Sequence, residues 1–112
     1  MTKHYRICRI DDIDEGEARS FLLHTPADQQ QIFIVRKNDL LAAYFNRCPH
    51  TGVNLDWVPH QLLDNSGEFI QCATHGALFN IDDGLCIQGP CVNQSLETVP
   101  ITLVDGWIEC NL

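Results

Sequence analysis

Two short segments of the chain each place a cysteine and a histidine close together. They are Cys48-Pro49-His50 and Cys72-Ala73-Thr74-His75. Thiolate and imidazole groups are typical ligands of transition metals. A stretch of 21 residues, 51–71, separates the two segments. If all four side chains bind one metal centre, the fold must bring two separate loops to a single point and hold them there.

The composition of this ligand set narrows the kind of metal centre. A structural zinc site usually opens with two cysteines a few residues apart, and a plant-type iron–sulfur site uses cysteines only. Here each segment supplies one thiolate and one imidazole. This set suits a [2Fe-2S] cluster in which one iron binds Cys48 and Cys72 and the other binds His50 and His75.

Length and composition indicate one globular domain. The chain has 112 residues, of which 45% are hydrophobic and 20% are charged, so residues 1–112 are predicted to form a single domain. The net charge of -8 argues against binding to nucleic acid or to an anionic membrane surface. This charge favours a basic protein partner, although it is equally compatible with a role in solubility alone.

No segment predicts export or membrane anchoring. No apolar run approaches the roughly 18 residues that cross a bilayer. Residues 1–6 are not followed by the apolar stretch of a secretory signal. We therefore expect a cytoplasmic protein that makes no membrane contact.

The other cysteines are expected to remain thiols in such a reducing compartment. Cys8 and Cys110 lie in apolar, strand-like surroundings and are predicted to be buried as small hydrophobic residues. Cys86 and Cys91 are close enough in sequence to pair. Free thiols are favoured for them, but the sequence leaves a disulfide open.

The apolar pattern is that of short strands, and helical periodicity is weak throughout, so we predict an all-β fold. Residues 11–17 form an acidic turn region. Asn38-Asp39, Asp82-Asp83-Gly84 and Asp105-Gly106 predict hairpin turns. The expected strands cover residues 4–10, 20–24, 31–36, 40–45, 68–71, 77–81, 85–88, 99–104 and 107–110.

Both metal-binding segments fall where the predicted strands end. Cys48 follows a strand that ends near Phe45, and Cys72 lies between two strands. Gly52 and Gly76 closely follow the two histidines. Glycine adopts positive φ readily and lets the backbone approach a cluster without a Cβ clash, and it also relieves strain in an ordinary turn. The two roles are compatible.

With these motifs the chain resembles the Rieske iron–sulfur proteins. The family pattern is Cys-x-His in one loop and Cys-x-x-His in a second, and Cys48, His50, Cys72 and His75 match it. Gly89-Pro90 matches the loop whose proline covers the cluster in that family. The resemblance implies a small fold of antiparallel sheets with two cluster-binding loops and a proline loop, and one [2Fe-2S] cluster per subunit.

The chain departs from the high-potential members of the family at two positions. Those proteins have a serine and a tyrosine after the second histidine, and the hydroxyls donate to cluster sulfurs. Ala77 and Phe79 occupy these positions here. Fewer donors to sulfur make reduction harder. We therefore predict a potential toward the low end of the Rieske range, which spans roughly −150 to +300 mV.

The resemblance implies a one-electron carrier that is not an enzyme by itself, and no residue is assigned a catalytic role. In this class a flavoprotein reductase takes electrons from NAD(P)H, and the ferredoxin passes them to a terminal oxygenase of the ring-hydroxylating type. An alternative is the small Rieske-like subunit of an NAD(P)H nitrite reductase. A structural zinc-binding module is less favoured, because Gly89-Pro90 has no role in one. The sequence does not specify the electron donor, the electron acceptor, the final substrate or the oligomeric state.

Overall fold

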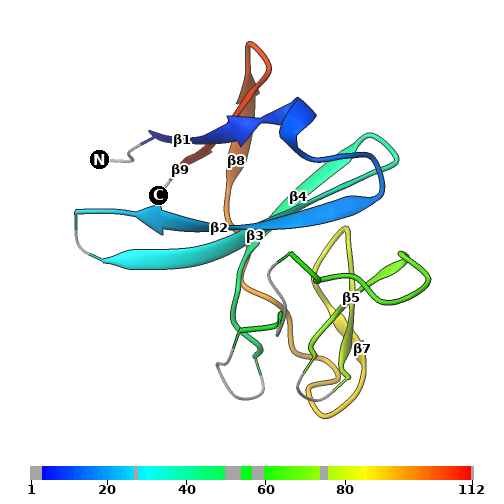
Figure 1. The fold of residues 1–112 in the computed structure, drawn as a ribbon. Helices are drawn as coiled ribbons and strands as arrows, with labels where there is room; N and C mark the ends of the chain where they lie inside the picture. Colours follow the sequence, from blue (N-terminus) through cyan, green and yellow to red (C-terminus); the bar gives the residue numbers. More distant parts are fainter. Residues whose placement is uncertain (1–3, 27, 50–53, 57–59, 74–75, 112) are drawn as a thin grey trace.

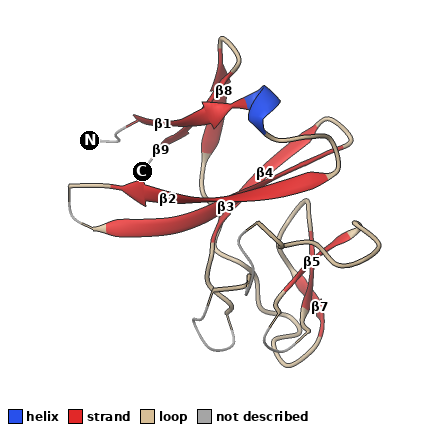
Figure 2. Ribbon diagram, in the orientation of Figure 1, coloured by secondary structure: helices blue, strands red, loops and turns tan. Residues whose placement is uncertain are grey.

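The computed structural model describes residues 4–26, 28–49, 54–56, 60–73 and 76–111. Within these residues the chain is almost entirely strand and loop, and the one helical segment is a short 3-10 turn, η1 (Ile10–Asp12) (Figure 2). The strands are β1 (His4–Arg9), β2 (Glu17–His24), β3 (Gln29–Lys37), β4 (Leu40–Phe45), β5 (Phe69–Gln71), β6 (Leu78–Asn80), β7 (Cys86–Gln88), β8 (Ile101–Val104) and β9 (Trp107–Asn111). The prediction of an all-β fold is confirmed.

The strands of the described residues form three antiparallel sheets, ordered β1-β9-β8, β2-β3-β4 and β5-β6-β7. The β2-β3-β4 sheet lies between the other two (Figure 1). The three predicted hairpins are present as β3-β4, β6-β7 and β8-β9. In the first, Asn38 and Asp39 have φ of 51° and 66°. Two successive residues with positive φ are typical of the tight turns that match the twist of paired strands.

The structure differs from the sequence-based prediction at two places, and both involve strand pairing. β1 pairs with β9, so that the first and last strands of the chain are neighbours, from His4 opposite Asn111 to Arg9 opposite Trp107. β2 begins at Glu17, earlier than the predicted residue 20, because its whole length pairs with β3. The region predicted as an acidic turn, 11–17, includes part of η1.

The central strand β3 separates two hydrophobic cores. Ile32 and Ile34 contact one core, and Phe33 and Val35 contact the other. Successive side chains of a strand point to opposite faces of its sheet. All four side chains are fully buried, which explains why this strand has a continuous apolar run rather than an alternation of apolar and polar residues.

We name the two cores after their positions in Figure 1. The upper core lies on the side of the β1-β9-β8 sheet, and its buried residues are Cys8, Ile13, Leu23, Ile32, Ile34, Ala43, Val99, Ile108 and Cys110. The lower core lies on the side of the β5-β6-β7 sheet, and its buried residues are Phe33, Val35, Ala42, Tyr44, Cys48, Leu55, Leu62, Ile70, Cys72, Ala77, Phe79, Ile81, Cys86, Cys91 and Leu96. Four of the six cysteines therefore lie in the lower core.

Cys8 and Cys110 are buried in the upper core, as predicted. Burial, together with the nearby negative charge of Asp12, raises the pKa of the Cys8 thiol to about 11. Burial also raises the pKa of Cys110. Both side chains therefore remain neutral and pack as small hydrophobic residues.

Candidate metal centre

Cys48 lies just beyond the end of β4, at the start of the first ligand loop. Three backbone hydrogen bonds fix the path of the chain between the end of β4 and Cys48. Phe45 N–H donates to Glu97 O at 2.9 Å, Asn46 N–H to Gln31 O at 2.8 Å, and Arg47 N–H to Phe45 O at 2.8 Å. The Cys48 side chain is 1% exposed. The thiol is thus held inside the lower core, although its neighbour Arg47 is exposed.

Cys72 directly follows β5 and begins a tight turn. Its N–H donates to Ala77 O at 2.9 Å, and its carbonyl accepts from Gly76 N–H at 2.8 Å. Gly76 has φ of 67°, which favours glycine because side chains with a Cβ rarely adopt this conformation. The Cys72 side chain is fully buried in the lower core.

A chain of hydrogen bonds ties the two ligand loops together through Leu55. Its carbonyl accepts from Ala73 N–H at 2.8 Å, and its N–H donates to Asn46 Oδ1 at 2.7 Å. The Asn46 amide in turn donates to Asp56 Oδ1 at 2.8 Å. Asn46 is 2% exposed and thus closes the base of the first loop from inside the protein.

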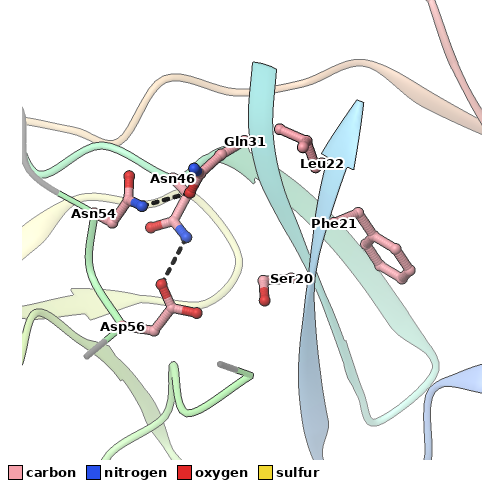
Figure 3. Close-up of a pocket in the computed structure, with 7 residues that line it drawn as sticks. All are labelled: Ser20, Phe21, Leu22, Gln31, Asn46, Asn54 and Asp56. Atoms are coloured by element: carbon pink, nitrogen blue, oxygen red, sulfur yellow. Dashed lines mark hydrogen bonds between the residues drawn. The ribbon is translucent and has the colours of Figure 1, made fainter. Parts of the chain in front are cut away.

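Sequence reasoning did not identify Asn46. Its place between an apolar strand and Cys48 is the one sequence signal that marks it. Figure 3 shows Asn46 and Asp56 facing each other at one side of a hollow of about 250 Å³. Asn54 donates to Gln31 Oε1 at the same place. These polar contacts connect the first loop to the middle sheet.

His60 also connects the segment between the ligand loops to the middle sheet. Its Nδ1 accepts the N–H of Ser20 at 3.0 Å, and its own N–H donates to Asp56 Oδ2 at 3.2 Å. His60 therefore acts as a link between this segment and β2.

The two predicted histidine ligands, His50 and His75, lie outside the described residues, as does Gly52. Among the residues that the structure describes, no group of three or more histidine, cysteine, aspartate or glutamate side chains is arranged to hold a metal ion. Of the four predicted ligands, the structure describes the two cysteines, Cys48 and Cys72. Both are buried in the same core, from loops that are bonded to each other. Two buried cysteines of this kind, each followed closely by a histidine, fit the sulfur and nitrogen ligands of a Rieske cluster.

The segment 86–91 packs against both ligand loops. Gly89 has φ of 105°, and a Cβ there would lie 2.8 Å from Ala77 Cα, at the end of the second loop. Cys86 and Cys91 are buried thiols without a disulfide, and their sulfurs are 3.0 Å apart. Burial, followed by hydrogen bonds and charge interactions with Cys86 and Cys48, raises the pKa of Cys91 to about 12. Pro90 lies exposed between these contacts.

The three antiparallel sheets, and two loops that each carry a buried cysteine, fit a small iron–sulfur domain. The family model of the Rieske [2Fe-2S] domain matches residues 3–111, and the chain belongs to this family. Its cofactor is accordingly a [2Fe-2S] cluster. No curated protein matches the sequence.

Solved structures share the fold at low sequence identity. The ferredoxin of carbazole 1,9a-dioxygenase from Nocardioides aromaticivorans IC177 is 21% identical, with a TM-score of 0.73 and 96% of each chain covered. A chain in a complex of reduced oxygenase and oxidised ferredoxin of carbazole 1,9a-dioxygenase is 20% identical, with a TM-score of 0.73, and covers 96% of this chain and 91% of its own length. The terminal oxygenase of carbazole 1,9a-dioxygenase from Novosphingobium sp. KA1 is 19% identical, with a TM-score of 0.77, but only 29% of that chain is covered.

Within the described part of the chain, no helix is long and apolar enough to cross a membrane.

Proposed function

We propose that Cys48 and Cys72 bind one iron of the cluster and that His50 and His75 bind the other. The burial of both cysteines in one core, and the Leu55 bonds that join their loops, support this assignment. A thiolate ligand needs protection from water and a fixed position, and the lower core supplies both. The histidines follow the cysteines at two and three residues, as in the family pattern.

We further propose that the protein is a one-electron carrier between a flavoprotein reductase that uses NAD(P)H and a terminal oxygenase. A bound [2Fe-2S] cluster supplies the electron chemistry. The match over 96% of both chains to a ferredoxin of a dioxygenase system supports this proposal. The oxygenase match supports it less, because most of that longer chain has no counterpart here.

The surface around the Gly89-Pro90 segment suits the docking of such partners. Ile87 and Val92 are 43% and 46% exposed on either side of it. Residues 84–96 contain no charged side chain, in a protein of net charge -8. An uncharged, partly apolar surface can lose its water at low cost when a partner binds. The same segment carries Cys91, which is buried in the lower core together with Cys48.

Spectroscopy of the purified holoprotein tests the ligand assignment. The reduced protein is expected to give the EPR signal of a mixed-ligand [2Fe-2S] cluster, with a lower average g value than an all-cysteine cluster. Inorganic sulfide should equal iron in amount. Substitution of His50 or His75 by alanine should remove or alter this signal. An unaltered spectrum in both variants, or protein with zinc and no sulfide, would overturn the assignment.

Electron transfer to a purified terminal oxygenase tests the carrier role. Val92→Asn is expected to reduce the transfer rate about tenfold, which corresponds to about 1.4 kcal/mol. Leu103→Asn is the matched control, because Leu103 is 52% exposed on β8, in the sheet beside the upper core. The potential should be unchanged in both variants. Equal effects of the two substitutions, or isolation of the native protein only in a nitrite reductase complex, would contradict the proposal.

A further inference from the structure

The hollow of about 250 Å³ lies between the first ligand loop and β2, which is an edge strand of the middle sheet. Asn46, Asn54 and Asp56 line this hollow on the side of the loop, and Ser20 and Leu22 line it on the side of β2 (Figure 3). A water molecule occupies roughly 30 Å³ in the liquid. The hollow is therefore large enough to admit the end of a long side chain from another molecule.

Asp56 gives the hollow a negative charge. Its Oδ1 accepts from the Asn46 amide at 2.8 Å, and its Oδ2 accepts from His60 N–H at 3.2 Å. Both donors are neutral groups, which fix the carboxylate without compensating its charge. Within the described part of the chain, no lysine or arginine lines the hollow, and the ion pairs of these residues involve other carboxylates. A carboxylate offers about four lone-pair positions, so Asp56 can accept further hydrogen bonds from a cation.

Aliphatic surface and neutral polar groups accompany this carboxylate. Leu22 is 49% exposed and lines the hollow, so it offers apolar surface to an entering side chain. Asn54 donates to Gln31 Oε1, and both of these residues also line the hollow. The lining thus combines one charged acceptor with amides and an aliphatic side chain.

This lining fits the side chain of arginine. A guanidinium group is planar and always charged, and it pairs with a carboxylate through two parallel N–H···O bonds. Its aliphatic stem can pack on apolar surface while the charged end reaches a polar group, and Leu22 and Asp56 supply these two contacts. The ammonium group of lysine is a compact, strongly hydrated charge that lacks the two-bond geometry. An anionic group would be repelled by Asp56.

We propose that the hollow receives an arginine side chain of the terminal oxygenase, and that Asp56 thereby helps to dock the reduced protein on its electron acceptor. This inference rests on the proposed carrier role. Asn46, which is bonded to Asp56, lies two residues before Cys48, so the hollow adjoins the loop that is proposed to bind the cluster. Reduction adds negative charge to the centre and strengthens its attraction to a nearby cation. An electron acceptor needs this preference, because it must bind the reduced carrier and release the oxidised one, whereas a reductase must do the opposite.

Binding of methylguanidinium, measured by NMR on the oxidised holoprotein, tests the hollow without a partner protein. The backbone amide signal of Leu22 and the side-chain amide signal of Asn54 should shift to saturation. Asp56→Asn should weaken this binding about tenfold, because a charge-assisted hydrogen bond is lost. Asp39→Asn is the control, because it removes the same charge from the exposed turn between β3 and β4. Methylurea, which has a similar shape but no charge, should not bind.

A second pair of variants leaves the bonds of Asp56 intact and decides the matter if Asp56→Asn does not fold. Leu22→Lys places a cation beside the hollow and should weaken the binding of methylguanidinium. Leu103→Lys adds the same charge at a position that is 52% exposed on β8, and it should not weaken binding. The inference is wrong if Asp56→Asn binds as the wild type does, if the two lysine substitutions have equal effects, or if methylurea binds as tightly as methylguanidinium.

Steady-state reduction of a purified terminal oxygenase tests the docking step. Asp56→Asn should raise the KM for this protein about tenfold relative to Asp39→Asn, with kcat unchanged. An effect confined to the reaction with the reductase would overturn the assignment to the acceptor. If the carrier role itself is wrong, the wild type does not reduce the oxygenase, although methylguanidinium still binds. If only this inference is wrong, the wild type reduces the oxygenase, and the two variants have equal KM values.

Discussion

The upper and lower cores share β3 but differ in how their edges are built. The upper core is closed by β1, β8 and β9. β8 pairs with β9 over four residue pairs, and β1 pairs with β9 over five, with a shift of register between Arg6 and Cys8. The strands beside the lower core are three residues long. The rest of its boundary consists of loops. Individual hydrogen bonds, such as those made by Asn46 and Leu55, connect these loops.

This difference indicates where the metal contributes to stability. Backbone ladders and aliphatic packing account for the upper core without a cofactor. The lower core contains both proposed cysteine ligands, and a bound cluster would cross-link its two loops. Because metal binding free energy becomes folding free energy at such a site, we expect the lower core to depend on the cluster more than the upper core does.

The largest expected effect comes from removal of a ligand. Cys72→Ala should abolish the chromophore and expose the amides of β5 and β6 to hydrogen exchange, while the amides of β9 remain protected. Cys110→Ala should retain the chromophore, because this equally buried cysteine lies in the upper core. Simultaneous loss of protection in β6 and β9 of Cys72→Ala would show that the two cores do not differ in this way.

Two neighbouring residues of β3 allow a direct comparison of the cores. Phe33→Ala creates a cavity in the lower core and Ile34→Ala creates one in the upper core. We expect losses of about 3–5 and about 2–5 kcal/mol, respectively, in the free energy of unfolding. The rate of cluster release, measured by loss of visible absorbance, should rise more in Phe33→Ala. Equal release rates would contradict a special dependence of the lower core.

A smaller effect is expected from the base of the first ligand loop. Asn46→Ala removes the bonds to Leu55 and Asp56 and leaves a buried N–H without a partner. The cost should be about 1–3 kcal/mol, with faster release of the cluster. Asn54→Ala is the control, since its amide bond to Gln31 is exposed. A cost in Asn54→Ala as large as that in Asn46→Ala would argue against the proposed role of burial.

The smallest effect concerns Tyr44, whose hydroxyl donates to Ile81 O at 2.7 Å within the lower core. Tyr44→Phe should cost about 1–2 kcal/mol at neutral pH, measured by chemical denaturation. Burial, and then the charges of Asp83 and Asp82, raises the pKa of Tyr44 from its ordinary value of 10.0 to about 12.

This pKa shift gives the pH dependence its sign. The folded state favours neutral Tyr44, so its contribution to stability is complete below pH 10 and is lost as the pH rises from about 10 to 12. The difference in stability between wild type and Tyr44→Phe should therefore shrink over that range. A difference that is constant from pH 8 to 12 would contradict the raised pKa.

Local sequence signals predicted most strands well. β4 has the predicted bounds, 40–45, and each predicted hairpin turn lies between the expected strands. Turn residues and the alternation of side chains act over a few neighbouring positions, so they can be recognised without knowledge of the fold. The pairing of β1 with β9 had no such signal, because the two strands are at opposite ends of the chain.

The sequence alone determined the ligand pattern, the family and the short strands, because these depend on residue types at fixed local spacings. Only the tertiary structure decided which side chains from different segments meet. It places Asn46 against Leu55 and Asp56, and it buries Cys91 in the same core as Cys48, although the two cysteines are far apart in sequence. Such contacts arise when sheets pack and exclude water, and local spacing does not encode which buried atoms then become neighbours.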